Sequence, residues 1–189
     1  MKPTVKIDVD GVLENLLYPL IDIYEERHSV RIPYESFTRY DFSNFKPNVR
    51  AEFLEILNTE DLVRRLEPLP GAYDTLQSMN ELYDVFLVTA TEPELFWAKS
   101  EWILRHFPFI KRCQILRIPG QYKHMFNTDL AIDDYHENLK KDMGYRILID
   151  APFNRCNDEA YGIYRVKDLA EAFDTARKIE EEMNAGEGY

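Results

Sequence analysis

The sequence predicts an α/β fold, an open and doubly wound parallel sheet flanked by helices. Short apolar runs alternate along the 189-residue chain with longer segments of helical periodicity. The runs at 5–9 and 84–91 match strands that are buried on both faces of a sheet. Three predicted strands also end in polar residues, and strands in such a sheet present their carboxyl ends at the edge where ligands bind.

The composition narrows the classes of function. Hydrophobic residues make up 45% of the chain and charged residues 30%, and the formal net charge is −11. This negative charge argues against surfaces for polymeric nucleic acid or anionic membrane, and no segment is long enough to span a bilayer. A small anionic substrate stays compatible, because a metal ion and one or two lysines reverse the local field. We expect a cytoplasmic protein in which Cys113 and Cys156 are reduced thiols.

The first predicted strand, 5–9, ends in two aspartates and a glycine. Alternation would place Asp8 and Asp10 on one side, whereas a strand ending at Val9 would put Asp10 on the turn, folded back over Asp8. Gly11 can close that turn tightly around a ligand. Two close carboxylates repel unless a cation or a shared proton offsets the cost, so they suit a divalent metal, a nucleophile or both. An ordinary Asp-Gly turn is the alternative.

A helical stretch follows the first predicted strand, and residues 30–68 after it differ in character from the rest of the chain. Apolar residues at helical spacing predict a helix over 16–27, and a second helix is expected over 49–57. Around them, short stretches alternate with prolines and turn residues, and aromatic residues are dense. A small helical subdomain needs most of those aromatics for its own core. We expect Tyr40 or Phe42 to face a cleft and stack on a planar ligand.

The remaining chain alternates regularly between helices and strands, and we expect five parallel strands in all. The expected helices after the connector 66–71 are 70–82, 93–106, 137–143 and a last one from Asp168 to about 183. The further expected strands are 84–91, 113–118, 129–132 and 145–149. In the second of these helices we assign Trp97 and Trp102 to the core.

Polar residues of compatible chemistry follow the predicted strands. Thr89 ends the second strand, Asp133-Asp134 ends the fourth, and Lys123 lies in a loop at the same edge. With Asp8 and Asp10 they supply what phosphoryl transfer through a carboxylate needs. One aspartate attacks phosphorus, and its neighbour protonates the leaving alcohol and later activates water. Mg²⁺ on the carboxylates neutralises charge, while the lysine and the hydroxyl hold the phosphoryl oxygens.

These residues resemble the four motifs of the haloacid dehalogenase (HAD) superfamily of aspartate-dependent phosphatases. The motifs are Asp8-Val9-Asp10-Gly11-Val12, Thr89, Lys123 and Asp133-Asp134. Further matches over nearly the whole chain resemble the 5'(3')-deoxyribonucleotidase family, also called 5' nucleotidase, deoxy, cytosolic type C. They are 66–72, the helix with Trp102 and Phe107, Ile132-Asp133-Asp134 and the loop with Asn154-Arg155.

The resemblance implies a role for each motif residue. Asp8 would be the nucleophile and Asp10 the general acid/base. Mg²⁺ would be held by Asp8, by the main-chain oxygen of Asp10 and by Asp134, with Asp133 beside it. The residues in contact with the phosphate would be Thr89, Ala90 and Lys123.

The resemblance also implies how the chain is divided. Residues 1–14 and 69–189 would form an HAD-like core domain, and residues 15–68 a small helical cap that selects the substrate. The cap departs from that of the mammalian members. Leu16 stands where they place a Phe, and Tyr40-Asp41-Phe42 is only a loose counterpart of their aromatic pair.

The implied activity is that of a Mg²⁺-dependent phosphoric monoester hydrolase of the 5'-nucleotidase type, acting in deoxyribonucleotide catabolism. It would hydrolyse (deoxy)ribonucleoside monophosphates to nucleosides through an aspartyl-phosphate intermediate. One alternative is an HAD phosphatase for another small phosphomonoester, such as a sugar phosphate. Another is a non-catalytic protein that binds a phospholigand, although the intact motif set argues against it. The expected partner is the small-molecule substrate, and a homodimer stays open as the assembly.

Overall fold

The computed structural model of this protein describes residues 2–140, 144–155 and 162–186, and a parallel sheet lies at its centre. Within these residues the strand order is β3-β2-β1-β4-β5-β6, and every neighbouring pair is parallel. The strands are Thr4–Asp8 (β1), Asp84–Thr89 (β2), Ile115–Arg117 (β3), Leu130–Asp133 (β4), Tyr145–Ile149 (β5) and Tyr164–Val166 (β6). The predicted α/β class is therefore confirmed.

Helices make up most of the rest of the described chain. The α-helices are Leu17–His28 (α1), Pro47–Leu57 (α2), Glu60–Arg64 (α3), Ala72–Leu82 (α4), Pro93–His106 (α5) and Leu169–Gly186 (α6). The 3-10 helices are Tyr34–Ser36 (η1), Arg112–Gln114 (η2), Gly120–Met125 (η3), His136–Asn138 (η4) and Pro152–Asn154 (η5). No described helix is both long and apolar enough to cross a bilayer.

The predicted strands need several corrections. The first strand lies one residue earlier than 5–9, and the second ends at Thr89 rather than at residue 91. The third strand is shorter than 113–118, because η2 takes up its first residues. The fourth begins one residue later than predicted and ends at Asp133. Strand β6 was not predicted, because it has only three residues and two of them, Tyr164 and Arg165, are exposed. β1 lies between β2 and β4 with Val5 and Ile7 completely buried, as a central strand requires.

The predicted helices agree more closely, with two exceptions. The expected helix over 137–143 is replaced at its start by the short η4, and residues 141–143 lie outside the described chain. Trp102 is buried as predicted, but the assignment of Trp97 to the core is wrong, because its side chain is 67% exposed. Asp168 does cap α6, since its Oδ1 accepts a hydrogen bond from the backbone N–H of Glu171 at 2.9 Å.

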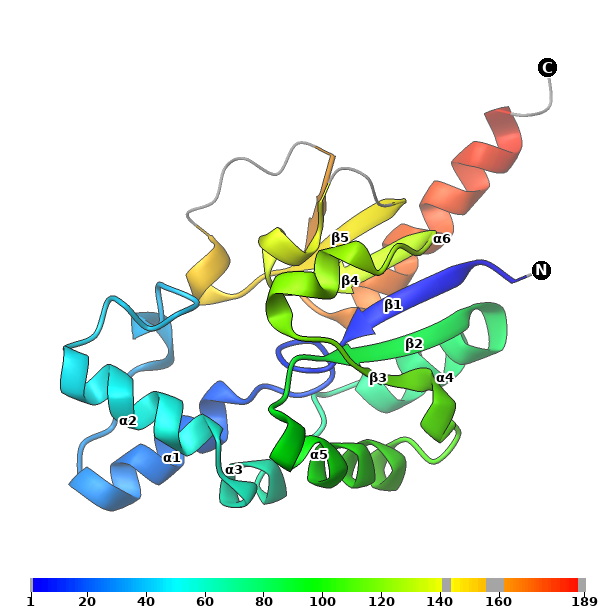
Figure 1. Cartoon of the computed structure of the whole chain (residues 1–189). Helices are drawn as coiled ribbons and strands as arrows, with labels where there is room; N and C mark the ends of the chain where they lie inside the picture. The colour runs from blue at the N-terminus through cyan, green and yellow to red at the C-terminus, as the bar shows by residue number, and fades with distance from the viewer. Residues whose placement is uncertain (1, 141–143, 156–161, 187–189) are drawn as a thin grey trace.

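The inserted segment (residues 15–68) carries α1, η1, α2 and α3 and lies where the strands end. Figure 1 shows α1 and α2 on the side toward which β1 and β2 point. Its core is aromatic: the ring of Phe53 packs against those of Phe37, Phe42 and Phe45 with centroids 5.1–5.6 Å apart. This cluster continues into the core beneath the sheet without a break. The segment is thus packed firmly over the carboxyl edge of the sheet.

Candidate active site

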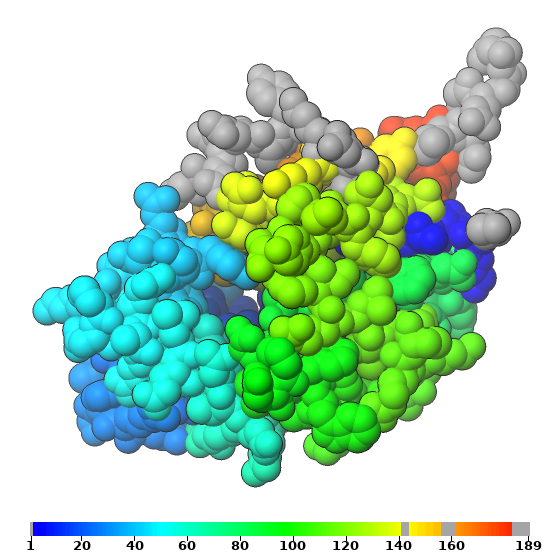
Figure 2. All heavy atoms as spheres, viewed as in Figure 1, coloured from blue at the N-terminus to red at the C-terminus, as the bar shows by residue number. Residues whose placement is uncertain are grey.

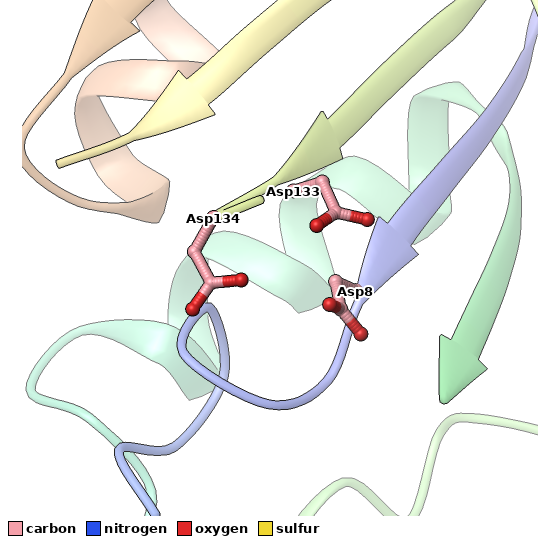
Figure 3. Close-up of side chains that lie close together, drawn as sticks. All are labelled: Asp8, Asp133 and Asp134. Atoms are coloured by element: carbon pink, nitrogen blue, oxygen red, sulfur yellow. The ribbon is translucent and has the colours of Figure 1, made fainter. Parts of the chain in front are cut away.

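Three carboxylates meet at the carboxyl edge of the sheet, and we call them the acidic cluster. Asp8 ends β1, Asp133 ends the neighbouring strand β4, and Asp134 follows directly. Ligand atoms of the three side chains all lie within 4.8 Å of one another, and all three residues are buried. Figure 3 shows them around the ends of β1 and β4. The predicted parallel sheet is what brings these residues together across more than 120 positions of sequence.

Gly11 allows the loop after β1 to lie against the acidic cluster. Its φ of 79° is in the left-handed region, and a Cβ at this position would overlap the carboxylate of Asp134. In Figure 3 that carboxylate lies next to the loop. A larger residue at position 11 would therefore displace Asp134 or open the turn.

Lys123 supplies positive charge to the acidic cluster. Its Nζ donates a hydrogen bond to Oδ1 of Asp8 at 2.7 Å, and the backbone N–H of Val9 donates to the same oxygen at 2.7 Å. Burial alone would lower the pKa of Lys123, but Asp8 and Asp133 outweigh it and hold that pKa above its usual range. The lysine is charged at neutral pH and lies in η3 rather than in the irregular loop expected from the sequence.

The acidic cluster still lacks positive charge. Burial, followed by the charge of Asp133, raises the pKa of Asp8 well above its usual range. Burial, followed by the charges of Asp8 and Asp133, does the same for Asp134. Oxygen ligands at this spacing suit a hard divalent cation such as Mg²⁺, whose charge would offset that repulsion. The donor set therefore fits the predicted cofactor.

Asp10 has different surroundings, although it is only two residues from Asp8. One carboxylate oxygen, Oδ2, accepts a hydrogen bond from the hydroxyl of Thr89 at 2.9 Å. The other, Oδ1, accepts one from Nζ of Lys99 at 2.6 Å. Burial alone would raise the pKa of Asp10, but Lys99 outweighs it and holds that pKa below its usual range. Both carboxylate oxygens of Asp10 thus have hydrogen-bond donors, whereas the neighbouring acidic cluster lacks positive charge.

Glu14 completes this second group, and we call Asp10, Glu14, Thr89 and Lys99 the Asp10 network. Nζ of Lys99 also donates to Oε1 of Glu14 at 2.7 Å. Both the lysine and the glutamate are buried. Burial raises the pKa of Glu14 to about 8, because the lysine charge that would oppose it is shared with Asp10.

Lys6 and two asparagines hold the loops that carry the site. Nζ of Lys6, buried beneath the cluster, donates to the backbone oxygens of Lys123 at 2.8 Å and Asn138 at 3.2 Å. The Asn138 side chain in turn donates to Oδ1 of Asp133 at 3.0 Å. Asn154 donates to the backbone oxygen of Asp134 at 2.8 Å. Burial lowers the pKa of Lys6 to about 8.

A cavity of about 710 Å³ lies between the inserted segment and the sheet edge. Asp8, Asp10, Lys123 and Asp134 are on the sheet side of its lining, together with the predicted Ala90. The opposite wall is largely apolar and comes from α1, α2 and α3. Figure 2 shows a hollow between the cyan atoms of the inserted segment and the green atoms of the sheet domain. Its volume is sufficient for a small phosphorylated ligand.

Tyr40 and Phe42 both line this cavity, but neither ring is freely available for stacking. One face of Tyr40 is covered by Tyr135, with centroids 3.8 Å apart and ring planes at 11°. A planar ligand could use only the other face. Phe42 is buried and packs edge-on against Phe37 and Phe53. Stacking on these rings stays a prediction, and Tyr40 is the better placed of the two.

Sequence reasoning missed three charged residues of the site: Lys6, Glu14 and Lys99. None of them ends a strand, which is the position that singled out the others. Lys6 did carry a signal, because it is a cation inside an apolar run that predicts a fully buried strand. Lys99 carried a weaker one, since it occupies an inward position of α5 between the buried Leu95 and Trp102.

Comparison with known proteins supports the family resemblance that the sequence motifs indicated. A family model described as "5' nucleotidase, deoxy (Pyrimidine), cytosolic type C protein" matches residues 2–179. The 5'(3')-deoxyribonucleotidase of Clostridium acetobutylicum is 29% identical over 175 residues, covering 90% of this chain and 96% of the relative. That of Bacillus subtilis is 29% identical over 160 residues, covering 82% and 89%.

Solved structures share the fold. A hydrolase from Pseudomonas syringae has a TM-score of 0.61 at 13% identity and covers 94% of this chain and 99% of its own. An HAD family hydrolase from Deinococcus radiodurans, crystallised with bound phosphate and sodium, has a TM-score of 0.55 at 15% identity and covers 90% and 93%. At these identities the likeness is one of fold.

Proposed function

The chain belongs to the family of 5' nucleotidase, deoxy (Pyrimidine), cytosolic type C proteins, and from this we propose that it is a Mg²⁺-dependent cytoplasmic nucleotidase. It hydrolyses deoxyribonucleoside and ribonucleoside monophosphates to nucleosides and phosphate. The family and its curated relatives support phosphomonoester hydrolysis. The observation that carries the proposal is the division of labour at one sheet edge: a lysine-bound Asp8 within an acidic cluster, and a separately held Asp10 beside it.

In the first step a carboxylate oxygen of Asp8 attacks the substrate phosphorus. Lys99 keeps Asp10 ionised in the free protein, so Asp10 has to take up a proton as the substrate binds, and the negative phosphate arriving beside it favours that uptake. The bond from phosphorus to the ester oxygen then breaks, and Asp10 gives this proton to that oxygen, so that the nucleoside leaves as an alcohol. Lys123 and the hydroxyl of Thr89 bind the phosphoryl oxygens as negative charge spreads over them. The product is an aspartyl-phosphate on Asp8.

In the second step a water molecule attacks the phosphorus of the aspartyl-phosphate. The Asp10 carboxylate takes a proton from that water, the bond from phosphorus to Asp8 breaks, and inorganic phosphate is released. Asp10 is then protonated again. Its two roles explain why it must be held apart from the acidic cluster, because a carboxylate bound to a metal is not free to carry protons.

The acidic cluster would hold the Mg²⁺. Asp8, Asp134 and the main-chain oxygen of Asp10 are the proposed ligands, with Asp133 beside them. When bound, the ion supplies positive charge against the phosphoryl oxygens and offsets the repulsion within the cluster. Asn138 and Asn154 hold Asp133 and the backbone of Asp134, so the chain itself keeps the carboxylates in place.

Residues 15–68 are proposed to act as the substrate-selecting cap of a core formed by residues 1–14 and 69–189. The apolar wall that this segment gives the cavity, with Tyr40 at its edge, would receive the nucleoside while the phosphate lies at Asp8. An apolar wall of this kind favours a nucleobase over a bare sugar, which offers hydroxyl groups rather than a ring face. This supports the nucleotide over the sugar phosphate as substrate.

A steady-state screen tests the proposed function. Deoxyribonucleoside and ribonucleoside 5'- and 3'-monophosphates and a panel of sugar phosphates are compared by kcat/KM, with Mg²⁺ present and after chelation. We expect at least one nucleotide to exceed every sugar phosphate by about tenfold or more, and activity to depend on Mg²⁺. Sugar phosphates that match or exceed all nucleotides would favour the alternative phosphatase. No turnover of any phosphomonoester would favour a binding protein. Light scattering in the same buffer decides between a monomer and a homodimer.

A further inference from the structure

We propose that Lys99 and Glu14 are positioning residues for Asp10, and that they tie the orientation of its carboxylate to the two chain segments that connect the inserted segment to the sheet. The inference rests on the proposed function, because it assigns these residues to the proton transfer by Asp10. It goes beyond that function by naming two buried residues that one ammonium joins to Asp10, with no hydrogen bond to the acidic cluster within the described residues.

Lys99 is a buried lysine whose ammonium contacts Asp10 directly. Its side chain is 3% exposed, and Nζ donates to Asp10 at 2.6 Å and to Glu14 at 2.7 Å. Burial of a lysine is costly unless carboxylates compensate it, and here two do. These two short contacts fix Oδ1 of Asp10, whereas its Oδ2 is held by the hydroxyl of Thr89.

Glu14 links this pair to the connecting segments. Its backbone oxygen accepts a hydrogen bond from the N–H of Gly11 at 2.8 Å, and it forms an isolated bridge with Pro68 of the returning segment. The next residue pair along, Leu13 and Leu69, is also joined, by a 2.8 Å backbone hydrogen bond. Glu14 is thus located where the chain leaves for the inserted segment and comes back.

Helix α5 holds both connecting segments from the other side. Lys99 reaches Glu14 on the outgoing segment, and Trp102, one turn later, donates from its indole N–H to the backbone oxygen of Leu66 at 2.9 Å. Oε2 of Glu14 is buried and, among the described residues, has no hydrogen-bond partner. A buried carboxyl oxygen without a hydrogen-bond partner destabilises the fold, so its presence calls for a functional reason. Positioning of Lys99 against Asp10 provides one.

Two substrates with different leaving groups can distinguish a positioning role of Lys99 from a purely structural one. A nucleoside leaves as a strongly basic alkoxide and needs the proton of Asp10, whereas p-nitrophenolate is stable without one. The ratio kcat/KM reports the steps up to the first irreversible one, which is the formation of the aspartyl-phosphate. Misplacing Asp10 should therefore lower kcat/KM for the nucleotide and spare kcat/KM for p-nitrophenyl phosphate.

The experiment compares the best nucleotide of the screen with p-nitrophenyl phosphate in one Mg²⁺ buffer, using wild type, Asp10→Asn and Lys99→Met. We expect Lys99→Met to reduce kcat/KM for the nucleotide by about 10- to 100-fold and that for p-nitrophenyl phosphate by less than about 3-fold. Lys178→Met, a change of an exposed helical lysine on α6, should leave both unchanged. Equal losses on both substrates would overturn the positioning role.

A second variant covers the case in which Lys99→Met fails to fold because two buried carboxylates lose their partner. Glu14→Gln/Lys99→Met removes the ammonium without leaving Glu14 charged and unpaired, and we expect the same selective loss on the nucleotide. Retention of wild-type kcat/KM on the nucleotide by either folded variant would refute the inference. Failure of the proposed function looks different: Asp10→Asn itself would then show no dependence on the leaving group, or wild type would not hydrolyse the nucleotide.

Discussion

The acidic cluster and the Asp10 network lie side by side at the same sheet edge, yet their charges are balanced in opposite ways. In the acidic cluster three carboxylates share one direct ammonium contact, from Lys123, and the pKa values of Asp8 and Asp134 are raised. In the Asp10 network one ammonium bridges two carboxylates, and the pKa of Asp10 is lowered. The first group needs an added cation to balance its negative charge, whereas in the second the ammonium of Lys99 already balances the charge of Asp10. Neighbouring aspartates can therefore take different chemical roles.

The largest effect should follow from replacing the carboxylate that belongs to the acidic cluster. Asp8→Asn removes the proposed nucleophile, so we expect kcat to fall by more than about 10⁴-fold. The metal-free variant should be no less stable than wild type, because a neutral amide relieves the repulsion from Asp133. Activity assays and thermal melting after chelation check both parts. Residual activity in a rigorously purified sample, free of contaminating phosphatase, would exclude Asp8 as the nucleophile.

The dependence of stability on pH should distinguish the two groups. Asp8, Asp134 and Glu14 have raised pKa values in the folded state, so each stabilises the protonated folded form at low pH, and that contribution is lost as pH rises through the folded pKa. For Glu14 the window runs from about pH 4.5 to about 8. Asp10 has the opposite sign, because its lowered pKa gives stability above its unfolded pKa that is lost only in acid.

We therefore expect the metal-free protein to lose stability between about pH 5 and 8, and Glu14→Gln to remove of order 3 kcal/mol of that loss. Mg²⁺ should remove the share that comes from the acidic cluster. Urea unfolding at several pH values, for wild type and Glu14→Gln with Mg²⁺ and with chelator, separates the two shares. If stability depended on pH in the same way in all four combinations, the two groups would not differ in charge balance as we describe.

Metal binding should act on one group alone. At 100 times its dissociation constant, Mg²⁺ should stabilise wild type by about 2.7 kcal/mol, or roughly 5–10 °C in melting temperature. Asp134→Asn should lose most of this shift, whereas Asp10→Asn should keep it, since only the main-chain oxygen of Asp10 is a proposed ligand. Differential scanning fluorimetry over a Mg²⁺ titration is sufficient. A full shift in Asp134→Asn would place the metal elsewhere.

The smallest effect concerns the lysine beneath the acidic cluster. Lys6→Met leaves the backbone oxygens of Lys123 and Asn138 without their ammonium donor, and we expect a loss of about 1–2 kcal/mol in the free energy of unfolding. The exposed Lys2 offers a matched control, and Lys2→Met should change stability by less than about 0.5 kcal/mol. Denaturant midpoints measure both. Equal stability of the two variants would show that the loops are held without Lys6.

The predictable part of the site is the part that lies at strand ends. Asp8, Thr89 and Asp133 each close a strand, so the rule for parallel sheets was enough to place them at one edge. The partners of Asp10 were not predictable in this way. Lys99 lies in the middle of a helix, and only the tertiary packing of α5 against the connecting segments brings its ammonium to Asp10.

The fold shows the same limit in its details. Apolar runs located the long central strands, but β6 escaped because three residues with two exposed side chains carry no periodic signal. Trp97 was placed in the core on hydrophobicity alone, whereas the buried face of α5 carries Lys99 and Ser100 beside its apolar residues. Lys99, which holds Asp10, thus interrupts the apolar pattern on which the prediction relied.

The backbone contacts between the two connecting segments have a consequence for how such proteins diversify. Two backbone contacts join the ends of the inserted segment, and we call this place its neck. They are the hydrogen bond from Leu69 to Leu13 and the bridge between Glu14 and Pro68. Doubling the length of a loop that is already closed costs only about 0.6 kcal/mol in chain entropy. Segments of other sizes can therefore be grafted at this neck with no change in the register of β1 and β2. The residues at the carboxyl edge of the sheet can therefore stay the same while the inserted segment changes.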